Sequence, residues 1–195
     1  MCESKNFYCW LLEFSVLLLL LLALCLWLAI RPESPKYTIV DITIPKSDID
    51  SGGQNGSIIY ALEIENSNKV SSIYHEDTIL RFYYGSETVG EKTIPSFHQG
   101  RGKTRQVTDS VDGNPQVWKA IRNSISNATA ELKVAVLTRV QFRTWGVKSK
   151  HHGLDLQSQI SIGSNGKIFG KTKKIKLHRA SKKWRRRNDR RRSLY

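Results

Sequence analysis

A stretch of seventeen residues without a formal charge, Phe14–Ile30, places the strongest constraint on what this chain can fold into. It contains six consecutive leucines, Leu17–Leu22, and lacks the polar face that a helix at the surface of a globular protein keeps. A helix that begins at Leu11 reaches about 30 Å by residue 30, which matches the hydrocarbon core of a bilayer. The sequence therefore predicts one transmembrane helix over residues 11–30, preceded by a short head over residues 1–10.

A cleaved secretory signal is the alternative interpretation of the same segment. Ala23 and Cys25 are small residues of the kind that precede a cut, here after Cys25. The apolar region of such a signal is about 7–15 residues long, which is shorter than the segment here. The length therefore favours an uncleaved anchor, although the flanking charges nearly cancel and do not indicate its orientation.

The formal charge of +14 is concentrated at the C-terminus. Residues 167–195 contain seven Lys and seven Arg against one Asp, whereas residues 37–166 contain 14 basic and 13 acidic residues. The middle thus has the composition and length of one ordinary globular domain, to which we assign residues 31–177. The basic remainder, residues 178–195, is predicted to be a disordered, solvated tail.

The charge density of this tail favours polyanions as partners, because their binding releases condensed counterions. Anionic lipid and acidic polysaccharide are the candidates. Nucleic acid is not expected, since a membrane anchor argues against a nuclear protein. The residues that we expect to bind polyanions are Lys182, Lys183, Arg185, Arg186, Arg187, Arg190, Arg191 and Arg192.

All three cysteines, Cys2, Cys9 and Cys25, lie before or within the apolar segment. The domain that follows therefore has neither a disulfide nor a thiolate metal site, and its hydrophobic core alone must hold it together. Cys2 and Cys9 are candidates for reversible S-acylation on the cytosolic side of the membrane. Unmodified thiols are the equally weighted alternative.

Alternation of apolar and polar residues predicts β-strands through most of the domain. The clearest strands are residues 130–142 and 154–162, and Asn165-Gly166 supplies two residues with positive φ for a hairpin turn after the second. Shorter strands are predicted over residues 37–44 (an edge strand ended by Pro45), 58–64 and 79–84.

One segment has helical spacing instead. Asn114-Pro115 is a typical helix start, and Val117, Trp118, Ile121 and Ile125 follow on one face. Several short strands and a single helix predict a mainly β domain, an antiparallel sandwich with one short helix.

No pattern for catalysis or for a cofactor is present. The triplets Gly102-Lys103-Thr104 and Gly170-Lys171-Thr172 lack the earlier glycine that a phosphate-binding loop requires. His151-His152 and Asp155 do not form a metal site, because adjacent strand residues point to opposite faces. The sequence therefore predicts a protein without enzymatic activity, cofactor or metal.

Two glycosylation sequons, at Asn55 and Asn127, each lie in a turn-like stretch beside a strand. A glycan could be accommodated at either position. Together with the absence of cysteine from the domain, the sequons favour a domain outside the cytosol.

The order and spacing of several short motifs resemble the plant NHL family, the non-race-specific disease resistance/harpin-induced-like proteins, over about residues 10–177. The motifs are Asn66-Ser67-Asn68, Ile73-Tyr74-His75-Glu76-Asp77, Phe82-Tyr83-Tyr84-Gly85, Pro95-Ser96-Phe97-His98-Gln99-Gly100, Arg139-Val140-Gln141-Phe142-Arg143 and Trp145-Gly146-Val147-Lys148-Ser149. The family's usual Asn-Pro-Asn has Ser67 in the middle here, and an adhesion-like Asn-Gly-Asp of some relatives is Asn165-Gly166-Lys167.

The resemblance implies an immunoglobulin-like β-sandwich of the late embryogenesis abundant type 2 (LEA-2) kind. It also implies a single-pass plasma-membrane protein of defence or stress responses, with its N-terminus in the cytosol and protein partners in immune signalling. Two alternatives stay open at this point. One is a desiccation-type protein that binds apolar ligands or membranes, and the other is a reversed topology in which the basic tail binds anionic lipid.

Overall fold

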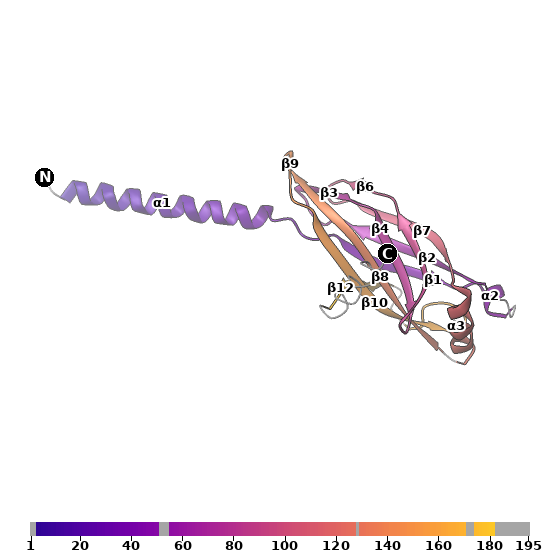
Figure 1. The fold of residues 1–195 in the computed structure, drawn as a ribbon. Coiled ribbons are helices and arrows are strands. Elements are labelled where there is room, and N and C mark those ends of the chain that lie inside the picture. Colours follow the sequence, from indigo (N-terminus) through magenta and orange to yellow (C-terminus); the bar gives the residue numbers. More distant parts are fainter. Residues whose placement is uncertain (1–2, 51–54, 128, 171–173, 182–195) are drawn as a thin grey trace. The chain divides into compact units, whose positions relative to one another are not determined.

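The computed structural model describes residues 3–50, 55–127, 129–170 and 174–181. It divides into two compact units, Met1–Glu33 and Ser34–Tyr195. The helices are α1 (Glu3–Ile30), α2 (Lys46–Asp50) and α3 (Pro115–Asn127) (Figure 1). The strands, in chain order, are β1 (Lys36–Thr43), β2 (Ser57–Glu65), β3 (Ser71–His75), β4 (Thr78–Tyr84), β5 (Glu87–Ile94), β6 (Phe97–Gln99), β7 (Thr104–Asp112), β8 (Thr129–Thr144), β9 (Val147–Lys148), β10 (His152–Gly163), β11 (Ile175–Lys176) and β12 (His178–Arg179).

The first unit contains the apolar helix α1. Its segment Phe7–Leu28 contains an 18-residue window with a mean hydropathy of 2.7 and is long and apolar enough to cross a membrane. The helix begins at Glu3, so the predicted head is helical from that residue onward. Neither Gly nor Pro interrupts the chain before Pro32, which disfavours helix at the residue before it and so explains the end at Ile30.

The second unit is a sandwich of two antiparallel sheets, as the alternating patterns predict. One sheet has the strand order β11-β1-β2-β7. The other has the order β12-β10-β8-β3-β6, with β4 and β9 also paired to β8 and with β5 paired to β4. The predicted strands correspond to β1, β2, β4, β8 and β10, and each differs from its predicted bounds by a few residues at most.

Strand β8 is the central strand of its sheet. Twelve of its sixteen residues pair with β10 along one edge. On the other edge its first half pairs with β4 and its second half with β3. The long alternating pattern of β8 reflects this position, because both of its edges are hydrogen-bonded while its two faces meet different surroundings.

Three features differ from the sequence-based expectations. Strand β1 is not an edge strand, because the two-residue β11 pairs with it at Ile39 and Thr38. Strands β3, β5, β6, β7, β9, β11 and β12 were not predicted. In β7 only Val111 is fully buried, so no apolar alternation marks it, and its pairing with β2 along nine residues makes it a strand.

The turn after β10 is also longer than predicted. Gly163 N–H donates to Lys167 O, which encloses a three-residue loop. Only Gly166 has a positive φ, 73°, whereas Asn165 does not. A type I turn followed by one left-handed residue gives this loop length, and a Cβ at Gly166 would lie 2.3 Å from Ile44 O.

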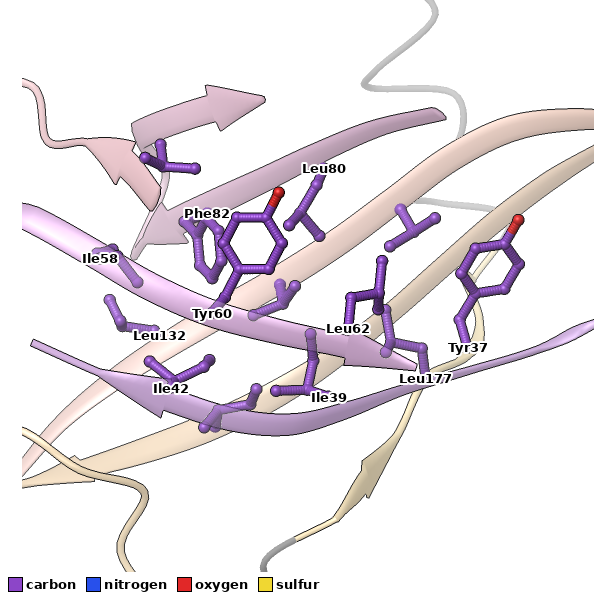
Figure 2. Packing of buried hydrophobic residues seen from close by; sticks show 14 of the residues in the cluster. Tyr37, Ile39, Ile42, Ile58, Tyr60, Leu62, Leu80, Phe82, Leu132 and Leu177 are labelled. Carbon is purple, nitrogen blue, oxygen red and sulfur yellow. The ribbon is translucent and has the colours of Figure 1, made fainter. Parts of the chain in front are cut away.

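The hydrophobic core lies between the two sheets (Figure 2). Tyr60 of β2 contacts Phe82 of β4 across the layers, with ring centroids 5.8 Å apart. The largest fully buried side chains come from both layers and from α3: Trp118, Tyr37, Tyr60, Phe82, Ile39, Ile42, Ile44, Ile58, Leu62, Ile64, Ile73 and Leu80. The core thus joins strands that are far apart in sequence.

A second, smaller cluster lies on the outer face of the β8 sheet. Ala135 and Leu137 of β8 are buried there with Tyr83 and Ala180. Ala180 N–H donates to Asp155 O, and β12 pairs with β10. The domain therefore extends beyond residue 177, and its C-terminal segment covers two apolar residues of β8 that interrupt its polar face.

The two ends of the sandwich carry different features, and Figure 1 shows α2 and α3 together at one end and β9 at the other. We call the end that contains Lys36, where the chain arrives from α1, the proximal end. Lys36 pairs with Glu65, the last residue of β2, and Ser71 of β3 pairs with Thr144, the last residue of β8. The distal end holds α2, α3 and the turn between β4 and β5.

Helix α3 closes the core at the distal end. Its N-cap is Asn114, whose Oδ1 accepts a hydrogen bond from Gln116 N–H at 3.0 Å. Trp118 is fully buried and lies so close to Gly56 and Gly113 that a Cβ would come within 1.9 and 2.5 Å of its ring. The predicted apolar face of the helix, which also includes Val117, Ile121 and Ile125, is therefore confirmed.

We expect Trp118→Asp to lower the free energy of unfolding by more than about 4 kcal/mol, because it removes a large core side chain and buries an unpaired charge. Urea unfolding followed by circular dichroism measures the loss. The matched control is Trp145→Asp, because Trp145 is 69% exposed and lies in a turn that tolerates Asp. Equal unfolding midpoints for the two variants would contradict this role of α3.

Candidate functional site

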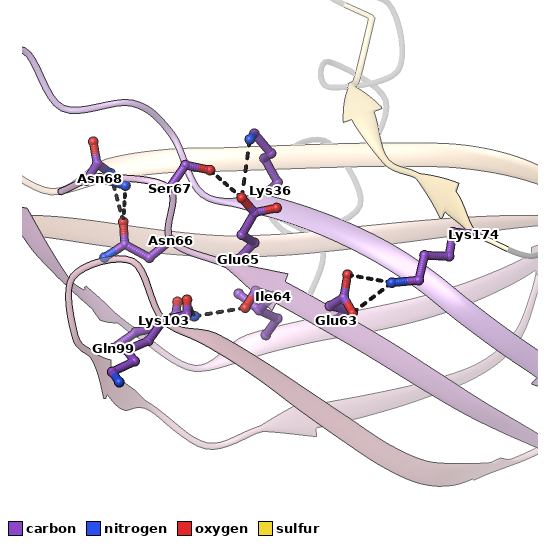
Figure 3. A network of polar contacts seen from close by, with 10 residues as sticks. All are labelled: Lys36, Glu63, Ile64, Glu65, Asn66, Ser67, Asn68, Gln99, Lys103 and Lys174. Carbon is purple, nitrogen blue, oxygen red and sulfur yellow. Dashed lines mark hydrogen bonds and ion pairs between the residues drawn. The ribbon is translucent and has the colours of Figure 1, made fainter.

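The most concentrated group of polar side chains in the domain is buried at the proximal end and begins with Asn66 (Figure 3). Its Nδ2 donates to Ser71 O at 3.0 Å and to Gly100 O at 2.9 Å. Its Oδ1 accepts from the backbone N–H and the side-chain Nδ2 of Asn68. The donors and the acceptor of the fully buried Asn66 side chain are thus all hydrogen-bonded. These bonds connect three segments of the backbone.

Gln99 continues this network in the core. Its Nε2 donates to Ile64 O and to Lys103 O, each at 2.8 Å. Its Oε1 is then the atom that faces His75 Nε2 at 2.9 Å. Because Oε1 is an acceptor, the proton of the imidazole lies on Nε2.

The other imidazole nitrogen is consequently an acceptor. His75 Nδ1 lies 2.8 Å from the hydroxyl of Tyr37, which donates to it. The ring also stacks on Phe97, with centroids 4.4 Å apart and an interplanar angle of 10°. The guanidinium group of Arg105 lies over the same Phe97 ring, with its Cζ 4.2 Å from the ring centre. The neutral imidazole is thus fully paired, with Nε2 as its donor and Nδ1 as its acceptor.

Burial is the main cause that lowers the pKa of His75 to about 4, and the neighbouring Arg105 and His98 lower it further. The hydrogen bond to Gln99 opposes this shift. Burial also raises the pKa of the Tyr37 hydroxyl above its usual range. Both groups are sealed from solvent, so they hold the fold together and offer no surface for acid–base chemistry.

Two hollows occur on the outer face of the β8 sheet. One, of about 230 Å³, is lined by Tyr74, His98, Gln141, Arg143 and Lys148. The other, of about 490 Å³, is lined by Glu76, Asp77, Ile79, Leu137, Thr138, Arg139, Gly153 and Asp155. The first is basic and the second is mainly acidic, and both are lined largely by polar side chains.

The candidate sites from the sequence lie apart from one another. Asn55 precedes β2 and Asn127 ends α3, and both are exposed at the distal end. Cys9 is exposed on α1. Cys2 and all eight polyanion-binding candidates (Lys182, Lys183, Arg185, Arg186, Arg187, Arg190, Arg191 and Arg192) lie outside the described residues.

The two adjacent histidines have different neighbours, and His151 lies just before β10 while His152 is its first residue. His151 Nε2 lies 3.5 Å from Glu76 Oε1, whereas the His152 ring contacts Phe142. Within the described ranges, no group of three or more His, Cys, Asp or Glu side chains converges on one point. Gly102 has a φ of 59° in the turn before β7, so its triplet belongs to a turn.

Reasoning from the sequence missed the buried network and the basic hollow. The available signal for the network was a polar residue at an inward position, since His75 alternates with the buried Ile73 in β3. For the hollow no signal exists, because Tyr74, His98 and Gln141 come together only through the pairing of β3 with β6 and β8.

The His75 geometry predicts a stability that depends on pH. The folded state has the lower pKa, about 4 against an ordinary value of 6.5, so it binds fewer protons than the unfolded chain between these values. The stabilisation is therefore present above pH 6.5 and is lost as the pH falls to 4, by about 3 kcal/mol. Urea unfolding at pH 7, 5.5 and 4 measures this.

The matched variants are His75→Gln and His98→Gln, since His98 is exposed and adjacent to the network. We expect His75→Gln to be less stable than the wild type at pH 7 and to lose most of the pH dependence. His98→Gln should retain it. An unchanged pH slope in His75→Gln would show that other groups cause the dependence.

Comparison with known proteins gives a consistent family assignment. The family model described as late embryogenesis abundant protein (LEA_2) matches residues 61–158, which is 98 of the 195 residues. Among solved structures, an Arabidopsis thaliana protein known by its solution structure aligns with a TM-score of 0.48 and 11% identity, over 68% of this chain and 83% of that one. A second, described as a late embryogenesis abundant protein, has a TM-score of 0.39 and 14% identity over 67% and 72%.

The sequence relatives are plant proteins. "Protein NDR1" of Arabidopsis thaliana is 27% identical over 172 residues, which cover 82% of this chain and 77% of the relative. "NDR1/HIN1-like protein 2" of the same plant is 25% identical over 75% of this chain and 65% of its own length. "NDR1/HIN1-like protein 3" is 24% identical over 77% and 71%. The family model, these relatives and the two-sheet fold agree, and the chain belongs to the LEA-2 family of NDR1/HIN1-like proteins.

Proposed function

We propose that this chain is a single-pass plasma-membrane protein of plant defence and stress responses, which acts by binding and not by catalysis. The observation that carries the proposal is the architecture. One apolar helix is followed, after only five residues, by a self-contained β-sandwich of the NDR1/HIN1-like kind. Such a chain holds a rigid domain close to a membrane and presents its loops to protein partners of immune signalling or to the cell wall.

The absence of catalysis is supported by where the perturbed groups lie. Catalytic acids and bases need a shifted pKa together with access to a substrate. Of the described groups, His75, Tyr37 and Tyr60 have strongly shifted pKa values, and all three are buried in the core. The family is not known for enzymatic activity, and no cofactor is needed for the binding role.

The orientation that we propose places the N-terminus in the cytosol and the domain outside it. Both sequon asparagines are exposed, and both lie at the distal end of the sandwich. A glycan at Asn55 or Asn127 would therefore project from the end opposite to the attachment of α1. Their accessibility supports the extracytosolic side, where glycans are added.

Expression of the full chain in plant cells tests this orientation. We expect deglycosylation to increase its gel mobility, and Asn55→Gln together with Asn127→Gln to abolish that shift. The control is Asn165→Gln, an asparagine at the same end that is in no sequon. A domain that an external protease leaves untouched on intact cells would contradict the orientation and would favour the reversed topology.

A desiccation-type role with an apolar ligand inside the sandwich is less well supported. The space between the sheets is filled by large side chains such as Tyr37, Tyr60, Phe82 and Trp118. The two hollows lie outside the core and are lined mainly by polar residues. An apolar ligand between the two sheets would therefore have to displace core side chains.

The basic tail is proposed to bind acidic wall polysaccharide or anionic lipid through residues 182–192. We expect the domain without α1, from Ser34 onward, to lose retention on pectin, heparin and anionic vesicles when it ends at Ser181, and the domain that keeps the tail to be released steeply by salt. Ending at Ser181 keeps Ala180, which the outer cluster needs. Equal retention of both chains at low salt would assign binding to the sandwich itself.

A charge-conserving variant distinguishes specific contacts from charge alone. Replacement of the six arginines at 185–187 and 190–192 by lysine should weaken binding less than replacement by glutamine, because lysine keeps the charge and loses the forked hydrogen bonds. Retention as a function of salt concentration gives both comparisons.

A further inference from the structure

The tip of the hairpin between β8 and β9 exposes two large apolar side chains. Trp145 is 69% exposed and Val147 is 74% exposed, and only Gly146 separates them. Tyr74, 41% exposed, lies on the neighbouring β3. Outside α1, the described residues contain only five exposed large apolar side chains, which are Ile59, Tyr74, Trp145, Val147 and Phe169. Two of the five thus lie at the tip of one hairpin.

The backbone holds Trp145 outward at a conformational cost. Thr144 pairs with Val147, so the turn has two residues, and φ is 49° at Trp145 and 87° at Gly146. Positive φ at both positions defines a type I′ turn, which favours Asn or Asp at the first position. A bulky residue in the left-handed region costs about 1 kcal/mol. A strained turn that exposes an aromatic ring to solvent indicates that the ring has a binding partner.

The hairpin lies at the proximal end of the domain. Thr144 pairs with Ser71, whose carbonyl accepts from Asn66, and Asn66 follows the residue that pairs with Lys36. Only residues 31–35 connect Lys36 to the last residue of α1. The six residue steps from Ile30 to Lys36 span at most roughly 21 Å. A domain attached to a spanning α1 therefore keeps this end close to the membrane surface.

Positive charge surrounds the apolar tip. Arg143 and Lys148 pair across the hairpin, and both line the basic hollow with Tyr74, His98 and Gln141. The described residues that line this hollow include no carboxylate. Aromatic rings favour the headgroup level of a bilayer, while Lys and Arg beside them bind lipid phosphates. This combination matches a phospholipid surface.

We propose that the β8–β9 hairpin is a second membrane contact of this protein. Trp145 and Val147 enter the interfacial region of the bilayer that α1 spans, and Arg143 and Lys148 bind the phosphates of its lipids. The domain is then held with its proximal end on the membrane and its distal end, with both sequons, away from it. This inference rests on the proposed anchoring by α1, and it adds a contact that the helix alone does not require.

The experiment uses the full chain in nanodiscs of phosphatidylcholine with a minor fraction of phosphatidylglycerol. The native cysteines at 2, 9 and 25 are replaced by serine, and one cysteine is introduced by Val147→Cys for a polarity-sensitive fluorophore. The matched control is Ser86→Cys, an exposed position in the β4–β5 turn at the distal end. We expect a blue-shifted emission at 147 and its quenching by lipids that carry a spin label near the headgroup, with neither effect at 86.

Further variants test the named side chains. Trp145→Asn relieves the strained turn and removes the ring, so quenching at 147 should fall while thermal stability does not. Arg143→Gln with Lys148→Gln should reduce quenching further. Retention of the chain on the disc reports α1 separately, so loss of retention would contradict the anchor. Retained chains with the same unquenched emission at 147 and 86 would overturn the proposed hairpin contact.

Discussion

Burial of apolar surface between two sheets is the interaction on which the rest of this domain depends. The domain has no cysteine, so neither a disulfide nor a thiolate-bound metal assists it. β8 sets the register within one of the two sheets, since it pairs with β10 over twelve residues and with β4 and β3 on its other edge. Across from it, β1 and β2 supply the facing layer, and Trp118 of α3 closes one end. Loss of packing at any of these points removes stability that no cross-link can replace.

The buried polar network adds specificity to this apolar core. Asn66, Gln99 and His75 lie where their polar atoms would be costly without partners, and each of these atoms has one. The pairing fixes one tautomer of the imidazole and connects β1, β2, β3 and β6 at the proximal end. The motifs by which the chain resembles its family thus include residues that determine how strands meet. Their role is structural, which agrees with the proposed function by binding.

The two ends of the sandwich have different chemistry, and this difference organises the proposals about function. At the proximal end, an exposed aromatic hairpin and a basic hollow lie near the point where the chain arrives from α1. At the distal end lie α2, α3 and both sequons. A domain that contacts lipid at one end leaves the other end for glycans and partners. The separation follows from antiparallel pairing, because each strand ends at the same end of the sandwich at which its paired neighbour begins.

The sequence by itself determined the elements whose signal is local. The apolar length of α1, the alternation in β8 and β10, and the capped amphipathic α3 were all predictable, because each pattern depends on neighbours in the chain. Ala135 and Leu137 were visible in the sequence as exceptions on the polar face of β8, but the sequence did not show the reason for these apolar residues. That reason is Ala180, which lies 43 positions beyond Leu137 and covers them in the folded chain.

Only the tertiary structure decided the features that depend on pairing between distant segments. β7 is a strand because β2 is beside it, and β1 is an inner strand because β11 returns to it. The tautomer of His75 is set by Gln99 and Tyr37, which are 24 and 38 residues away. The exposed Trp145 becomes a candidate for membrane contact only because the fold places it at the proximal end of the sandwich. Periodicity records which side of a strand is buried, whereas the identity of the covering residues is decided by the fold.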